Sequence, residues 1–126
     1  VLGVLWDAIG FSFVYGTSAG GIIGGFDFLL LRGVSYSDCH ANAPTIPAAE
    51  FALFMMMFAV ITPLLMTGAY AERMGFKYAL ILSVAFEVFV FYPVAHWVWG
   101  GGWLATQLGT LDFAGGIVIH TTAGAG

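Results

Sequence analysis

Charged residues are scarce in this chain. Asp, Glu, Lys and Arg make up 8% of its 126 residues, whereas soluble domains average about a quarter, so the sequence could not build a water-exposed surface. Three residues are basic and the net charge is −4, which excludes a basic patch that could bind nucleic acid. The single cysteine, Cys39, excludes an internal disulfide and a cysteine-rich metal site. Neither a P-loop nor an HExxH motif is present, so we expect no enzyme, no cofactor and no metal.

Apolar residues, in contrast, make up 60% of the chain, and the mean hydropathy is +0.96. A helix needs about 20 apolar residues to cross a hydrocarbon core of roughly 30 Å. Residues 51–71 meet this test without a charge, although Pro63 should kink the helix. Residues 78–99 meet it with one charge, Glu87. The sequence therefore predicts an all-α membrane protein.

Two partial spans flank these segments, over residues 1–16 and from residue 112 onward. We therefore expect four membrane helices, with residues 1–126 forming a partial domain that is truncated at both ends. Residues 18–47 hold Gly, Ser, Asn, Asp and Pro, which favours a long external loop. Glycine-rich segments at residues 20–25 and 100–102 should lie outside the hydrocarbon or against protein, because lipid cannot satisfy irregular backbone.

The basic residues predict the orientation. Arg73 and Lys77 lie together in the short link between the two complete spans, which leaves Arg32 for the other side. Because Lys and Arg concentrate in short cytoplasmic connections, this link should face the cytoplasm, opposite Trp99.

Two polar residues in the last span are candidates for function. Asp112 can cap the start of this helix by accepting the N–H groups of Ala114 and Gly115, and its charge would also attract cations to an external mouth. His120 follows it by eight residues, or ~12 Å of helix, near the middle of the bilayer. A ring at this depth either faces a cavity or is hydrogen-bonded to a neighbouring helix, and depth alone does not decide between them.

Aromatic residues gather near the external ends of the spans. Phe54 and Phe58 are four residues apart and share a helix face, and Trp99 ends the next span. Such rings can attract a desolvated cation, or they can form an interfacial belt or pack in the core. His96 and Trp97 are expected to be interface anchors. Glu87 is expected either to be protonated and bonded to another helix or to require a charged partner.

Several segments together resemble a known family. AERMGFK, YPVAHWVWGGGWLA and LDFAGGIVIHTTAGAG, in this order and spacing, resemble the ammonium transporter family (Amt/Mep/Rh), on its Amt side. FSFVYG is similar to the second membrane helix of that family, so the resemblance covers essentially the whole chain and corresponds to helices two to five of eleven. It implies a trimer in the cell membrane, each multi-pass monomer having a narrow hydrophobic pore built from two inverted five-helix repeats.

The resemblance also implies roles for individual residues. Phe54 and Trp99 would recruit ammonium, Phe58 would belong to the outer gate, Asp112 would be the essential aspartate, and His120 would be the first of two pore histidines that assist deprotonation. Ammonium, the bilayer, two further copies and a cytoplasmic regulatory protein are the implied partners. An ammonium sensor of the same fold is the alternative reading, and an unrelated membrane-structural subunit is a third.

Overall fold

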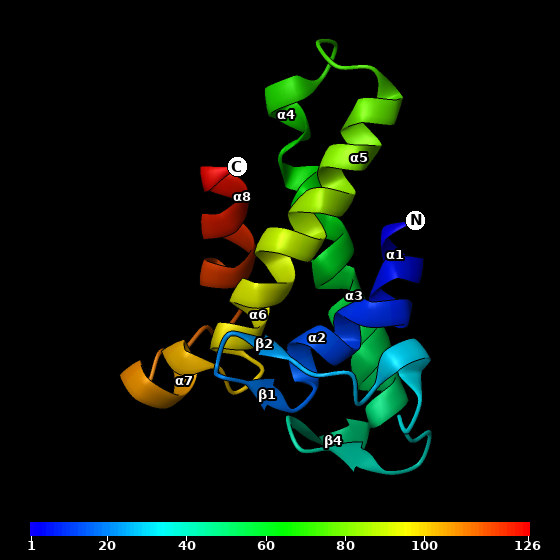
Figure 1. Cartoon of the computed structure of the whole chain (residues 1–126), viewed down its shortest axis with the longest axis vertical. Helices are drawn as coiled ribbons and strands as arrows, with labels where there is room; N and C mark the ends of the chain where they lie inside the picture. Colours follow the sequence, from blue (N-terminus) through cyan, green and yellow to red (C-terminus); the bar gives the residue numbers. More distant parts are fainter.

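The structure is a computed structural model that describes residues 1–126. Two long helical runs form the frame of the molecule. The first comprises α3 (Ala48–Leu65) and α4 (Thr67–Tyr70), and the second comprises α5 (Phe76–Phe86), η3 (Glu87–Phe91) and α6 (Tyr92–Val98). Ala48–Tyr70 and Phe76–Leu108 are both long and apolar enough to cross a membrane. Figure 1 shows the two runs side by side, joined at the top of the view. The predicted complete spans are confirmed.

Two shorter helical runs pack beside this pair. The first is α1 (Leu2–Leu5), η1 (Trp6–Gly10) and α2 (Phe11–Tyr15), and the last is η4 (Gly116–Thr121) and α8 (Thr122–Ala125). They occupy the positions of the two predicted partial spans. The four helical runs expected from hydropathy are therefore found, and two of them, Ala48–Tyr70 and Phe76–Leu108, are long and apolar enough to cross a membrane.

The loop between α2 and α3 contains regular secondary structure. It holds two small antiparallel sheets, which pair β1 (Ser18–Ala19) with β2 (Ile23–Gly24) and β3 (Cys39–His40) with β4 (Ala43–Pro47). A 3-10 turn, η2 (Leu29–Leu31), lies between the sheets, and α7 (Trp103–Leu108) follows α6. The helical fold class holds, but these short hairpins within the predicted loop were not expected from the sequence. They form because polar backbone outside the helices pairs with itself.

Three of the helical runs contain a π-helical segment, at η1, η3 and η4. In such a turn the backbone N–H bonds to the carbonyl five residues back rather than four, so the turn is wider and holds one extra residue. In η3 the N–H of Tyr92 bonds to the carbonyl of Glu87. The break in the first long run is different: α3 continues through Pro63 to Leu65, and the run is interrupted at Met66 before α4.

Large aromatic side chains fill the core between the helices. Trp6, Phe11, Phe91 and Tyr92 are all at most 1% exposed. Trp6 packs against Tyr92 with ring centroids 6.0 Å apart, and its Nε1 donates to the carbonyl oxygen of Ala52 at 3.0 Å. This bond satisfies the one polar atom of a buried indole. The run from α1 to α2, the run from α3 to α4 and the run from α5 to α6 therefore share one hydrophobic core, and these aromatic rings are among its residues.

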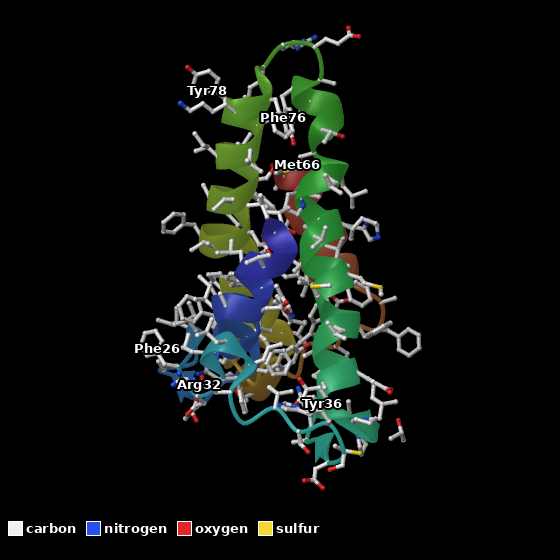
Figure 2. The ribbon with its side chains drawn as sticks, turned by 90° about the vertical axis from the view of Figure 1, so that its right-hand side faces the viewer. Phe26, Arg32, Tyr36, Met66, Phe76 and Tyr78 are labelled. Atoms are coloured by element: carbon white, nitrogen blue, oxygen red, sulfur yellow. The ribbon has the colours of Figure 1, made fainter.

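The basic link and the loops lie at opposite ends of the molecule. Figure 2 places Phe76 and Tyr78, which flank Lys77, at one end, and Arg32 and Tyr36 at the other. Trp99 ends α6 at the Arg32 end, where the hairpins gather. The prediction that Lys77 and Trp99 lie on opposite sides is confirmed.

Both glycine-rich segments also lie at the Arg32 end. They pack against each other, since the N–H of Trp103 donates to the carbonyl of Gly21 at 3.1 Å. As expected, this irregular backbone meets protein.

Candidate substrate recess

The end of α6 is anchored deep in the molecule by His96. Its Nδ1 donates to the carbonyl oxygen of Val14 at 2.7 Å, and its Nε2 lies 2.9 Å from the hydroxyl oxygen of Ser18. The ring is fully buried, so the prediction that His96 is an interface anchor is wrong. Sequence position alone does not reveal this role, because Val14 in α2 and Ser18 in β1 are both distant from His96 in the chain. Trp97 is half-buried and donates from Nε1 to the carbonyl of Ile22 at 2.7 Å.

Ser18 lies in the segment GTSAG, which matches the GxSxG pattern of serine hydrolases. In those enzymes the serine sits on a sharp turn from a strand into a helix, and a carboxylate orients the histidine. Here Ser18 lies in β1 after a helix, and a backbone carbonyl holds His96. The contact therefore anchors α6 to β1 and does not form a catalytic triad.

One face of α3 brings its aromatic rings toward the end of α6. The rings of Phe54 and Phe58 meet edge to face with centroids 5.3 Å apart, as their four-residue spacing predicts. Phe58 in turn lies 5.8 Å from Trp99 at an interplanar angle of 63°. The three aromatic candidates thus form a continuous row across two helices.

Asp112 closes the row from the start of the last helix. Its Oδ1 accepts the N–H of Gly115 at 2.7 Å, and its Oδ2 accepts those of Ile117 and Val118 at 3.0 and 2.9 Å. Capping is therefore confirmed, although Ala114 is not one of the donors. Gly115 has a φ of +85°, a left-handed conformation that glycine adopts readily, and this turn presents the free N–H groups to the carboxylate.

These side chains surround a recess of about 550 Å³. Its wall is mostly apolar, and Asp112 is the one charged residue in it. The indole Nε1 of Trp99 donates to the backbone oxygen of Asp112 at 3.3 Å, which joins two sides of the recess. The complete lining is Tyr15, Asn42, Phe51, Phe54, Met55, Phe58, Val98, Trp99, Thr110, Leu111, Asp112, Phe113, Ala114 and Gly115.

His120 is not part of this wall. It lies in η4, its side chain is exposed in the chain as described, and it does not line the recess. The structure therefore brings together four of the five predicted site residues and leaves His120 on an outer surface of the last helix.

Glu87 does not line the recess and has no exposed area. Its Oε1 accepts the hydroxyl of Tyr92 at 2.9 Å, and its Oε2 has no hydrogen-bond partner. Its partner is thus a neutral phenol one helical turn away and not a charge. Asp7 was missed by the sequence reasoning, and one of its carboxylate oxygens is likewise buried without a partner.

Comparison with known proteins decides the family. The sequence model described as "Ammonium Transporter Family" matches residues 1–126. The chain belongs to the ammonium transporter family. It is 64% identical over 124 residues to "Ammonium transporter 1" of Dictyostelium discoideum, covering 98% of this chain and 27% of that protein. It is 44% identical over 124 residues to "Ammonium transporter" of Bacillus subtilis, covering 98% of this chain and 30% of that protein.

Solved structures of family members agree. Mep2 of Saccharomyces cerevisiae superposes with a TM-score of 0.86 at 32% identity, covering 98% of this chain and 28% of that chain. Mep2 of Candida albicans superposes with a TM-score of 0.83 at 33% identity, covering 98% of this chain and 27% of that chain. The chain therefore spans less than a third of the length of these relatives.

Proposed function

We propose that this chain is part of a domain that transports ammonium across the cell membrane, and that its recess is where ammonium enters from outside. The observation that carries the proposal is the row of Phe54, Phe58 and Trp99 beside Asp112, the one charged residue of the recess. Relatives of this chain are named ammonium transporters, which supports the same substrate.

The chemistry of the recess suits a small hydrogen-bonding cation. Aromatic faces attract a partly desolvated cation by roughly 1 to 2 kcal/mol. The carboxylate of Asp112 adds a negative potential at the rim, while its oxygens hold the start of the last helix. The recess would therefore concentrate ammonium without binding it so tightly that release is slow.

Transport beyond the recess requires the loss of the charge. An ion in a dry apolar pore has a prohibitive solvation cost, whereas neutral ammonia does not. We propose that His120 lines this pore and assists deprotonation, and that its exposed position here is the face toward the rest of the transporter. Potassium has no proton to lose and would be rejected.

The same proposal includes the larger assembly. The transporter would have eleven helices in two inverted five-helix repeats, would form a homotrimer, and would bind a cytoplasmic regulatory protein at the Lys77 end. The likeness to Mep2 over a quarter of its length supports the fold of this part. An ammonium sensor of the same fold would use the same recess, so transport itself must be measured.

The test uses a host transporter, in which residues 1–126 replace the matching segment of the Dictyostelium relative. Ammonium-driven current and potassium competition are measured in reconstituted vesicles. We expect His120→Ala to depress the current, and His120→Asp and His120→Glu to let potassium compete, because a fixed charge replaces a proton-relaying ring.

Thr121→Ser, at the adjacent exposed position, is the matched control and should behave as the unsubstituted host. Unchanged current and selectivity in all three His120 variants would reduce His120 to a packing role. Ammonium binding without current in the unsubstituted host would instead favour a sensor.

A further inference from the structure

The turn between β3 and β4 reaches the recess through Asn42. This residue lines the recess, and its side-chain nitrogen donates to the carbonyl oxygen of Trp99 at 2.7 Å. Trp99 is the C-terminal cap of α6, where backbone carbonyls have no partner within the helix. A loop residue 57 positions away in the chain therefore satisfies the end of the helix that carries a wall of the recess.

His40 anchors the same turn. Its Nδ1 accepts the backbone N–H of Asn42 at 3.1 Å, and its ring stacks on Phe51 with centroids 5.4 Å apart at an angle of 23°. Three further rings stand around it, those of Phe11, Tyr15 and Phe28, at 5.8, 5.6 and 5.9 Å. We call these four rings the aromatic socket. Because Phe51 and Tyr15 also line the recess, the socket is the back of the recess wall.

The N–H of Trp99 bonds to the carbonyl of Ala95 within its own helical run. Two further hydrogen bonds join Trp99 to segments outside α6, and the bond from Asn42 is the shorter of these two. The other, from the indole Nε1 to the backbone oxygen of Asp112, is 3.3 Å long, against 2.7 Å for the Asn42 bond. Hydrogen bonds weaken as they lengthen beyond about 3 Å. The β3–β4 turn therefore restrains the backbone of Trp99 more firmly than the last helix restrains its ring.

We propose that Asn42 is a positioning residue for Trp99, and that the β3–β4 turn, held in its aromatic socket by His40, sets the affinity of the recess for ammonium. The inference rests on the proposed function of the recess. The attraction of a cation to an aromatic face requires the cation to lie within about 6 Å of the ring centroid. A Trp99 ring that shifts away from Phe58 would lose part of this attraction.

The test is the kinetics of ammonium transport by the host transporter carrying Asn42→Ala. We expect KM to rise about two- to tenfold, the range that the loss of one hydrogen bond gives, with a smaller change in the maximal rate. Thr45→Ala is the matched control, since Thr45 is exposed in β4 and makes no side-chain hydrogen bond within residues 1–126. Its KM should equal that of the unsubstituted host.

A double substitution separates positioning from general loop stability. If Asn42 acts through the ring of Trp99, Asn42→Ala should raise KM much less in a Trp99→Leu background, which has no aromatic face at this position, than alone. His40→Phe keeps the packing in the aromatic socket but removes the acceptor for Asn42, so it should raise KM in the same direction by a smaller factor. Should Asn42→Ala fail to reach the membrane, Asn42→Ser, a small polar residue at the same exposed position, replaces it.

Two results would overturn the inference. One is a KM for Asn42→Ala equal to that of Thr45→Ala, and the other is an equal fold-change with and without Trp99→Leu. If Trp99→Leu and Asp112→Ala also left transport unchanged, the proposed function itself would fail. If those two impair transport and Asn42→Ala does not, only the positioning role of Asn42 is lost.

Discussion

The indole ring of Trp99 meets the ring of Phe58 at 63° with centroids 5.8 Å apart, although the two belong to different helical runs. Both rings line the recess, together with Asp112. A small cation in that space would meet two aromatic groups and one carboxylate.

Trp99→Leu should keep an apolar wall but remove the aromatic face. We expect KM for ammonium in the host transporter to rise roughly five- to thirtyfold, which corresponds to a loss of about 1 to 2 kcal/mol. Trp103→Leu is the control, because Trp103 packs against Trp97 and does not line the recess. Equal KM values for the two variants would show that the aromatic face of Trp99 has no role in binding.

Substitutions of Asp112 should separate its cap from its charge. Asp112→Asn keeps one side-chain oxygen for the N–H groups of Gly115, Ile117 and Val118 but removes the charge. Asp112→Ala removes both and should lower stability by about 0.5 to 2 kcal/mol. We expect transport to be abolished in Asp112→Ala and strongly reduced in Asp112→Asn. The measurement is the ammonium-driven current in vesicles that contain equal amounts of each protein. Full activity in Asn would leave only the capping role.

Gly100→Ala should destabilise the end of α6. An added Cβ would collide with the carbonyl oxygen of Val14 and approach Nδ1 of His96 to 2.6 Å, the two atoms that already bond to each other. Overpacking of this kind costs about 1 to 3 kcal/mol. In Gly68→Ala the new Cβ enters open space in a helix, so a gain of up to about 1 kcal/mol is expected. Thermal unfolding of the two variants in detergent should shift in opposite directions.

The β3–β4 turn should weaken in acid. Burial in the aromatic socket lowers the pKa of His40 below its ordinary value of 6.5, and Tyr15 is the one titratable group among the four rings around it. The folded turn therefore favours the neutral ring. The stability from His40 is fully present above pH 6.5 and is lost as pH falls through the lowered value.

Protonation also removes the acceptor that Nδ1 offers to Asn42. The measurement is the melting temperature of the host between pH 7.5 and 5, compared with that of His40→Phe. The unsubstituted host should lose more stability than the variant over this range, and parallel curves would contradict the expectation.

Local periodicity accounts for what the sequence predicted well. Phe54 and Phe58 share a face because they are four residues apart on a helix, and the uncharged runs had the length of a span. Asp112 was predicted as a cap from its position at the start of the last run. Its donors differ from the prediction because η4 begins at Gly116 and not directly after Asp112, so the free N–H groups of Ile117 and Val118 at the start of the helix reach the carboxylate.

Contacts between distant segments could not be predicted from the sequence. His96 resembles an interface anchor until Val14 and Ser18 are seen beside it. Asn42 lies in a loop with no periodic pattern, so nothing in the sequence pointed to its bond with Trp99. The role of His120 stays a prediction, since its side chain is exposed and does not line the recess.

The π-helical segment Glu87–Phe91 contributes no atom to the recess, yet it sets the direction in which the recess residues point. Each residue of a helix advances the side-chain direction by about 100° around the axis. Deleting one residue here would close the turn to ordinary α geometry and swing the rest of the run around by about that angle. His96 would then lose Val14, and Trp99 would turn away from Phe58. The direction in which this wall of the recess faces thus depends on the length of a segment that does not line the recess.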